Sequence, residues 1–261
     1  MITMKPKHER KIALLTEYCG TNYAGWQRQD NAYTVQAAIE DALLDLLGQE
    51  VRLTASSRTD AGVHALGHVS HFTLKEHMIP TDAIPRALIS KLPPDISVLQ
   101  AVEVPETFHA RFHPVAKTYQ YHILNRTIPS ALEHDRVAHV PGRLDVAKMQ
   151  EGCRAFVGKH DFLALQASGA TTKTSVRTIY RLELTQVSQE RLVIEVEGDG
   201  FLYNMVRILA GTLLYVGQGK IEVESLPERI ASLDRRQMGK TMPPHGLYLA
   251  QVSYNPSPFS V

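Results

Sequence analysis

An apolar segment in the second half of the chain, FLYNMVRILAGTLLYV at residues 201–216, contains a single charged residue, Arg207. The segment is short for a membrane span and is interrupted by the arginine, so it predicts a helix buried in a globular protein. A buried guanidinium stays charged and needs an acceptor. Because the segment holds no carboxylate, the fold must supply one. Asp60 and Asp199 are the candidates, and contact with a phosphate or with solvent is the alternative.

Strand-like and helix-like patterns alternate in both halves of the remaining sequence. Apolar residues with helical spacing follow Thr34, which can cap a helix that Gly48 ends, and Asp145 can cap another. No low-complexity linker separates the halves, which we take as residues 1–105 and 106–261. We therefore predict an α+β fold of two similar mixed α/β halves. Strands are expected at 11–20, 51–57, 68–74, 96–104, 117–124 and 246–254, a hairpin at 176–200, and further helices after Asp82, over 201–217 and after Glu222.

Composition and charge exclude several classes of protein. Cys19 and Cys153 are isolated, with no CxxC pair, which excludes a zinc ribbon and a disulfide scaffold. The N-terminal stretch lacks the apolar region and cleavage site of a signal peptide, so we expect a cytoplasmic protein that is not in a membrane. Net charge is +1, but residues 143–181 hold seven Lys and Arg against three acids. This segregation favours an anion-binding face, and solvated faces of unrelated strands are an equal alternative.

The motif MGKT at residues 238–241 is superficially similar to a phosphate-binding loop. That loop requires a glycine five residues before Gly239, where this chain has Asp234, and no predicted strand precedes it. We therefore predict no nucleotide-binding motif.

The stretch SSRTDAGVHALGHVSHF at residues 56–72 places Arg58 two residues before Asp60. Residues two apart share a face of an extended strand, so the guanidinium can lie beside the carboxylate and lower its pKa. Alone, this pattern favours a structural salt bridge. If Arg207 is a second partner, Asp60 becomes a carboxylate anion held between two arginines, which suits nucleophilic attack.

Three histidines in the same stretch, His64, His68 and His71, raise the possibility of a metal site. In a strand His68 and His71 point to opposite faces, and no HExxH motif or cysteine accompanies them or the HARFH stretch at 109–113. The pattern favours histidines that are hydrogen-bonded or on the surface, and we expect no metal.

Aromatic residues alternate with basic residues in two places. The loop GTNYAGWQRQD contains Trp26 and Arg28, and the segment AKTYQY places Lys117 near Tyr119. This combination is typical of stacking on bases and contact with phosphates. Each aromatic residue taken singly is also typical of a protein core. Trp26 and Arg28 are therefore candidate substrate contacts, and His64 is a further candidate.

From Lys11 to Tyr254 the chain resembles the tRNA pseudouridine synthase A (TruA) family, and the RTDAGVHA motif is highly specific. The resemblance implies the pseudouridine synthase fold, with antiparallel-rich sheets joined around a central catalytic cleft. It also implies isomerisation of uridine to pseudouridine in the anticodon stem-loop of tRNA, at tRNA positions 38–40. The resemblance further implies that the enzyme is a homodimer and uses no metal or organic cofactor. The similar segments are GTNYAGWQRQDNAYTVQAAIEDAL, SRTDAGVHALGHVSHF, FHARFHPVAKTYQY, HDFLALQASG, SVRTIY, GDGFLYNMVRILAGTLL and PPHGLYLAQVSY.

The resemblance also implies a role for each residue of the catalytic set. Asp60 is the nucleophile, and Arg58 is associated with the space that the flipped base leaves. Tyr119 stacks on the uracil and is a candidate for proton transfer. Arg207 pairs with the aspartate, and Leu247 lines the pocket.

Two positions depart from the family pattern. Ser57 stands where glycine is common, so a positive φ there would be strained. His113 stands where a small hydroxyl residue is more usual. Both departures concern loop geometry and RNA preference more than the proposed nucleophile.

Two other functions remain open at this point. In the first, the chain is a non-catalytic RNA-binding protein in which Arg58 and Asp60 form only a salt bridge. In the second, which the motifs favour least, the histidines serve a metal-dependent hydrolase.

Overall fold

The computed structural model describes residues 9–169 and 174–259, which form two compact units. Unit 1 extends to Val115 and includes the C-terminal segment from Gln251, and unit 2 comprises Ala116–Ala250. The division into domains 1–105 and 106–261 stays a prediction. The expectation of no signal peptide concerns the N-terminal stretch, of which residues 1–8 lie outside the described residues. Residues 170–173, which are part of the predicted basic stretch, also lie outside them.

Unit 1 is built on an antiparallel sheet with the strand order β4–β1–β3, and the short β2 pairs with the outer edge of β3. The central strand β1 buries Ile12, Ala13 and Leu14 completely, which explains its continuous apolar sequence. The strands are β1 (Glu9–Tyr18), β2 (Thr54–Ala55), β3 (His64–Lys75) and β4 (Ile96–Val104).

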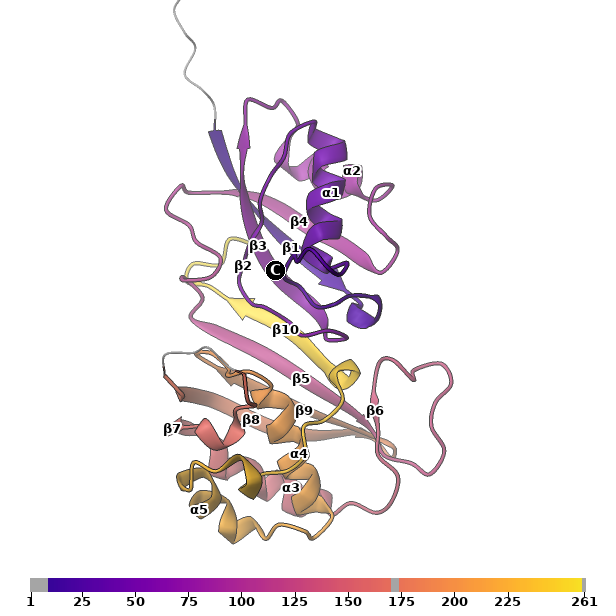
Figure 1. Cartoon of the computed structure of the whole chain (residues 1–261), viewed down its shortest axis with the longest axis vertical. Coiled ribbons are helices and arrows are strands. Elements are labelled where there is room, and N and C mark those ends of the chain that lie inside the picture. The colour runs from indigo at the N-terminus through magenta and orange to yellow at the C-terminus, as the bar shows by residue number, and fades with distance from the viewer. Residues whose placement is uncertain (1–8, 170–173, 260–261) are drawn as a thin grey trace, which may run out of the picture. The chain divides into compact units, whose positions relative to one another are not determined.

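Two helices, α1 (Val35–Leu47) and α2 (Ile84–Leu88), lie side by side against this sheet (Figure 1). The predicted ends of α1 are confirmed. The Thr34 hydroxyl accepts a hydrogen bond from the Ala37 N–H, and Gly48 ends the helix in the left-handed conformation. Short 3-10 turns occur at Gly20–Asn22 and Thr81–Ala83.

Unit 2 contains a sheet with the strand order β10–β5–β9–β8–β7, and β6 pairs in parallel with β5. The pairs β5–β9, β9–β8 and β8–β7 are antiparallel. The predicted hairpin is β8 and β9, joined by a tight turn. The strands are β5 (Ala116–Leu124), β6 (Ala138–His139), β7 (Gly158–Asp161), β8 (Val176–Ser188), β9 (Arg191–Gly198) and β10 (Leu247–Ser253, whose last three residues belong to unit 1).

Helices α3 (Val146–Cys153), α4 (Met205–Gly217) and α5 (Leu226–Ala231) accompany the sheet of unit 2, and α3 packs on α4 (Figure 1). Asp145 caps α3 as predicted, through a hydrogen bond of 3.0 Å from the Lys148 N–H. Further 3-10 turns occur at Arg154–Phe156, Leu163–Leu165, Val223–Ser225, Arg235–Gln237 and Pro244–Gly246.

The MGKT motif is a packing element against α4. Gly211 of the helix and Gly239 of the motif face each other so closely that a Cβ on Gly211 would lie 1.9 Å from the Lys240 carbonyl oxygen. The Gly239 N–H also donates to the Thr212 hydroxyl at 3.0 Å. The two glycines therefore allow two backbones to cross, which accounts for the motif without a phosphate.

The α+β class with mainly antiparallel strands is confirmed, with local corrections at the ends of elements. The strand predicted at 68–74 begins earlier, at His64. The predicted strand at 51–57 is reduced to Thr54–Ala55. The apolar helix begins at Met205 and not at residue 201, because Asn204 adopts the left-handed conformation with φ 60°. Across residues 9–169 and 174–259 no helix has the length and apolar character needed to cross a bilayer.

Candidate active site

Asp60 lies in a loop between β2 and β3, which we call the RTD loop (residues 57–63). Hydrogen bonds hold this loop at several points. The Thr59 carbonyl accepts from the Trp26 N–H at 3.0 Å, and the Thr59 hydroxyl contacts the Tyr18 hydroxyl at 2.8 Å. A turn bond of 3.1 Å joins the Val63 N–H to the Asp60 carbonyl. Asp60 is half-buried in a loop whose backbone is fixed on both sides of it.

Two glycines allow neighbouring backbone to approach the RTD loop. A Cβ on Gly20 would lie 2.0 Å from the Val63 carbonyl oxygen, and a Cβ on Gly25 would lie 2.6 Å from that of Thr59. Gly25 also has φ +91°, a conformation that L side chains rarely adopt. The loop GTNYAG thus supports the RTD loop by contact between backbones.

Arg58 is exposed, and within the described residues its side chain forms no hydrogen bond or ion pair. The salt bridge between Arg58 and Asp60 that the sequence favoured is therefore absent from this part of the chain. Ser57 is not among the residues with positive φ, so it does not impose the strain expected from the loss of glycine.

Trp26 and His64 are buried beside the RTD loop, and their role as substrate contacts stays a prediction. Trp26 is 0 % exposed and stacks on His68 with ring centroids 3.6 Å apart. His68 in turn contacts the Ser57 carbonyl at 3.0 Å. His64 is 1 % exposed, and its Nδ1 accepts a hydrogen bond from the Gly20 N–H at 3.0 Å.

Arg28 is partly exposed and is held by the carboxylates of Glu40 and Asp41, each 3.1 Å from one guanidinium nitrogen. Glu40 is almost fully buried and also accepts from Gln36 and from the Leu53 N–H. Arg28 therefore completes a buried polar network on α1. A phosphate that binds Arg28 would share its guanidinium with the carboxylates of Glu40 and Asp41.

Within unit 2, Arg207 lies in the first turn of α4 and is half-buried. Its Nε donates to the Met242 carbonyl at 2.7 Å, and one terminal nitrogen donates to the Asn204 side-chain oxygen at 2.6 Å. Asp199 is not its partner among the described residues, because that carboxylate accepts the Thr178 N–H at 2.9 Å and joins no ion pair. Of the two acids that the sequence offered, unit 2 therefore excludes Asp199.

A segment of six residues, Met242–Leu247, connects Arg207 to strand β5. The Met242 N–H donates to the Arg207 carbonyl at 3.2 Å, and the Tyr121 hydroxyl donates to the Pro243 carbonyl at 2.7 Å. Gly246 packs on the Tyr121 ring, where a Cβ would lie 2.8 Å from the ring carbon that bears the hydroxyl. Burial raises the pKa of Tyr121, which keeps its hydroxyl a donor. Leu247 follows directly and is buried.

Tyr119 lies on β5 two residues before Tyr121, so the two rings share a face of the strand. Tyr119 is 8 % exposed, and Phe201 packs edge-on against it with ring centroids 5.1 Å apart. Unit 2 therefore brings Tyr119, Arg207 and Leu247 to one region, through β5, α4 and the segment between them. Arg58 and Asp60 belong to unit 1.

The histidines that suggested a metal are engaged in hydrogen bonds. His71 is buried, its Nδ1 accepts from the Ala110 N–H at 3.2 Å, and burial lowers its pKa to about 4. Among the described residues no group of three or more His, Cys, Asp or Glu side chains is placed to hold a metal ion. The prediction that these histidines are hydrogen-bonded is confirmed.

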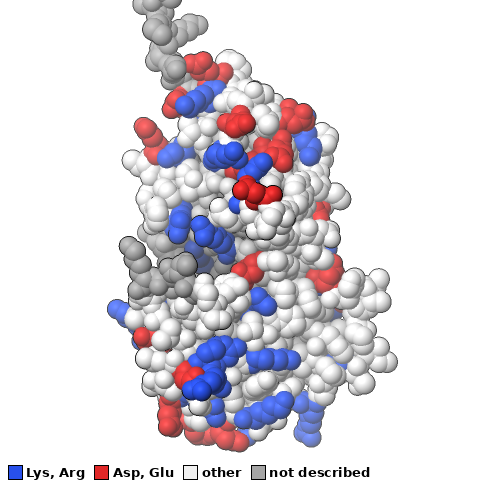
Figure 2. Space-filling model, viewed as in Figure 1, with Lys and Arg blue, Asp and Glu red and all other residues white. Residues whose placement is uncertain are grey.

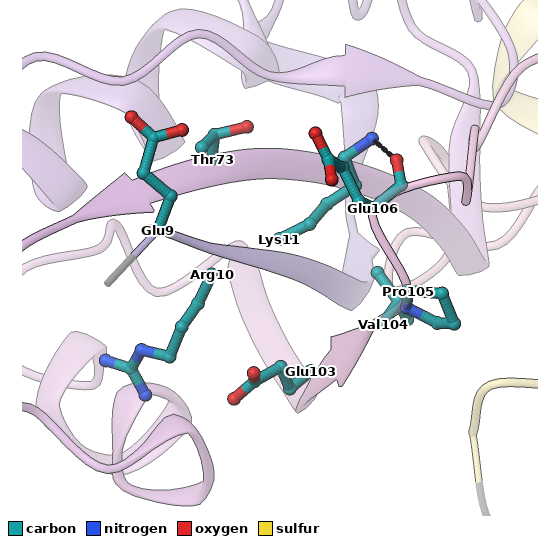
Figure 3. A pocket seen from close by; sticks show the side chains of 8 residues that line it. All are labelled: Glu9, Arg10, Lys11, Thr73, Glu103, Val104, Pro105 and Glu106. Carbon is teal, nitrogen blue, oxygen red and sulfur yellow. Dashed lines mark hydrogen bonds between the residues drawn. The ribbon is translucent and has the colours of Figure 1, made fainter. Parts of the chain in front are cut away.

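A cavity of about 600 Å³ in unit 1 contains none of the predicted site residues (Figure 3). Its cations are already engaged: Arg10 donates to the carbonyls of His77 and Ile79, and Lys11 to those of Glu106 and Phe108. We assign no catalytic role to it. On the face seen in Figure 2, Lys and Arg side chains gather over the part of the molecule that unit 2 forms.

The comparison with known proteins decides the family. The family model described as tRNA pseudouridine synthase matches residues 14–113 and 153–255, in both units. The chain belongs to the tRNA pseudouridine synthase family. The matched ranges include the RTD loop, Arg207 and Leu247, while Tyr119 lies between them.

Relatives in this family are similar over their whole length. A tRNA pseudouridine synthase A of Ruminiclostridium cellulolyticum is 51 % identical over 245 residues, which cover 94 % of this chain and 100 % of that protein. The proteins of the same name from Acetivibrio thermocellus and a Geobacter species are each 48 % identical over 94 % of this chain, and 100 % and 99 % of theirs. A solved Cbf5–Nop10–Gar1 complex aligns with TM-score 0.35 and 10 % identity, over 91 % of this chain and 48 % of that chain.

Several residues of the site gave little signal in the sequence. Gly20, Gly25 and Tyr18 support the RTD loop from a distance of about forty residues along the chain. Tyr121 gave a signal, since strand alternation places it beside Tyr119, but its bond to Pro243 depends on tertiary structure.

Proposed function

We propose that this chain converts uridine to pseudouridine in the anticodon stem-loop of tRNA, at tRNA positions 38–40, with Asp60 as the nucleophile. Membership of the tRNA pseudouridine synthase family makes it an isomerase that acts on tRNA. The observation that carries the role of Asp60 is the RTD loop itself, a half-buried aspartate in a backbone fixed by Thr59 and Val63.

The isomerisation breaks the bond between N1 of uracil and C1′ of the ribose and forms a bond from C5 to C1′. The proton of C5 is released, and N1 takes up a proton, so no oxidant or reductant is needed. Asp60 starts the reaction by attack on C6 or C1′, or by assisting elimination. A carboxylate held in one position is suited to each of these because orientation supplies much of the rate.

The target uridine is stacked in the stem-loop and must leave the stack, at a cost of about a few kcal/mol. Arg58 is exposed and unpaired within the described residues, so its guanidinium can fill the space that the base leaves. We propose that Tyr119 stacks on the extruded uracil and takes part in proton transfer, that Arg207 pairs with Asp60, and that Leu247 lines the pocket. Arg28 contacts the RNA backbone.

We propose further that the protein acts in the cytoplasm as a homodimer. Sedimentation of the purified chain, with one species at twice the monomer mass, tests the dimer. The same assembly must persist in the presence of tRNA.

The function is tested with tRNA that carries tritium at C5 of uridine, in buffer with EDTA. Isomerisation releases the tritium because C5 becomes the glycosidic carbon. Asp60→Asn is expected to bind tRNA with a Kd within threefold of the natural chain and to release no tritium. Asp82→Asn, at an exposed position of the same unit, is the matched control and should release tritium normally.

Three other results of this assay would each lead to a different conclusion. Binding without tritium release by the unmodified protein would favour a non-catalytic RNA-binding protein. Loss of release on adding EDTA would favour metal chemistry. Turnover by Asp60→Asn would remove Asp60 from the role of nucleophile.

A further inference from the structure

The HARFH stretch forms a rigid turn in unit 1, which we call the 109–113 turn. The N–H groups of Phe112 and His113 donate to the His109 carbonyl at 3.3 and 3.1 Å, and the His109 N–H donates to Nδ1 of His113 at 3.2 Å. The backbone is thus closed by its own hydrogen bonds. Such a turn holds its side chains in fixed directions.

Ala110 anchors the 109–113 turn to the rest of unit 1. This residue is 0 % exposed, its N–H donates to Nδ1 of His71 at 3.2 Å, and its carbonyl accepts from the Tyr254 hydroxyl at 2.7 Å. Lys11 adds a tether just before the turn, since its ammonium donates to the carbonyls of Glu106 and Phe108 (Figure 3 shows the first of these bonds).

Phe112 is 71 % exposed on this anchored turn. Its ring lies against His109 with centroids 4.3 Å apart and an angle of 32° between the planes. The Arg111 guanidinium carbon lies 5.6 Å from the centre of the Phe112 ring. The ring is thus held outward beside a cation, and most of its surface is open to a ligand.

The charges around Phe112 are positive. Arg111 joins no ion pair in residues 9–169 and 174–259. The pKa of His109 is lowered, first by burial and then by the nearby charges of His113, Lys11 and Arg111, and no carboxylate contributes to the shift. An exposed aromatic ring next to the Arg111 guanidinium fits a ligand with a flat π face and an anionic group, which is the chemistry of a nucleotide.

We propose that the 109–113 turn is a stacking site for an unpaired nucleotide of the RNA substrate, with the base on Phe112 and a phosphate on Arg111 and His113. The proposal rests on the proposed function only in so far as that function supplies RNA as the ligand. It assigns the turn to substrate binding and not to the chemical step.

Phe112→Ala in the full chain tests the site through the Kd for tRNA at fixed salt. Loss of one stacked base is expected to raise the Kd about tenfold. Phe112→Trp keeps a stacking ring and should restore the Kd to within twofold. Ile89→Ala, at a position of unit 1 that is 75 % exposed, is the matched control and should leave the Kd unchanged. At saturating tRNA, kcat of Phe112→Ala should stay within twofold.

Fluorescence gives a second readout that does not depend on catalysis. The chain has one tryptophan, Trp26, which is fully buried, so Phe112→Trp adds an exposed fluorophore. Titration with a single-stranded oligouridylate should quench this added emission, and the emission of Ile89→Trp should not change. The unmodified protein supplies the Trp26 background.

The proposal is overturned if Phe112→Ala binds tRNA with the natural Kd or if Ile89→Ala loses affinity equally. It is also overturned if Phe112→Ala changes only the sedimentation of the protein, which would make the turn a contact between copies. Failure of the proposed function has a different signature: no tritium release by the unmodified protein, with the effect of Phe112→Ala on the Kd still present.

Discussion

Gly25→Ala should separate the stability of the fold from the placement of Asp60. Gly25 has φ +91°, and a Cβ there would lie 2.6 Å from the Thr59 carbonyl oxygen. The positive φ costs an alanine about 1–2 kcal/mol. Ordinary contact begins near 3.4 Å, so the Thr59 carbonyl must also move by about 0.8 Å. Thr59 directly precedes Asp60, so the carboxylate moves with it.

A displacement of about 1 Å in a catalytic group costs on the order of 100-fold in rate. We therefore expect Gly25→Ala to lower kcat/KM for tritium release by about 100-fold, with a loss of about 1–3 kcal/mol in the free energy of unfolding. Urea denaturation measures the second quantity on the same preparation. The loss of activity must be measured where the variant is fully folded.

Gly48→Ala is the matched control. Gly48 also has positive φ, at +65°, but a Cβ there meets nothing within 4 Å. The control should lose about 1–2 kcal/mol of stability and keep its activity. If Gly25→Ala keeps activity within threefold of Gly48→Ala, contact with Thr59 does not position Asp60 and the reasoning fails.

Three further predictions concern single groups. Arg207→Lys keeps the charge but cannot donate to both Met242 and Asn204, so kcat should fall at least about tenfold and stability by about 2 kcal/mol; unchanged tritium release would contradict this. Tyr18→Phe removes the buried hydrogen bond to Thr59 and should lower the free energy of unfolding, measured by urea denaturation, by about 1 kcal/mol. An unfolding midpoint equal to that of the natural chain would contradict this. The pKa of His71 is about 4 in the folded chain, below its unfolded value of about 6.5, so stability is present above pH 6.5 and falls as pH falls towards 4. Between pH 7.5 and 5 this loss should reach about 2 kcal/mol, and His71→Gln should show a smaller fall; equal falls would refute the assignment.

Local signals in the sequence predicted the secondary structure well where the cause of the structure is local. Thr34 and Gly48 mark the ends of α1 because capping and the left-handed stop depend on a few neighbouring residues. The same reasoning misplaced the start of α4. The apolar pattern continues through Asn204, but the left-handed backbone at that residue delays the helix to Met205.

The sequence indicates candidate site residues but not the groups that hold them in place. Arg207 could be identified as a charge that needs acceptors, since no acid lies near it in sequence. Its bonds to Met242 and Asn204 could not be identified, because a carbonyl is present at every position and carries no sequence signal. The same limit applies to Tyr121 and the Pro243 carbonyl.

The sole tryptophan shows why residue type alone does not decide between a site residue and a core residue. An aromatic residue beside an arginine in a polar loop is equally compatible with a base-stacking platform and with a core residue. In the structure Trp26 is buried, its ring stacks on His68, and its backbone N–H donates to the Thr59 carbonyl. Because His68 also contacts the Ser57 carbonyl, this pair of rings fixes the RTD loop on the N-terminal side of Asp60. For Asp60 in its proposed role as nucleophile, this support lowers the entropy that the loop would otherwise lose at each turnover.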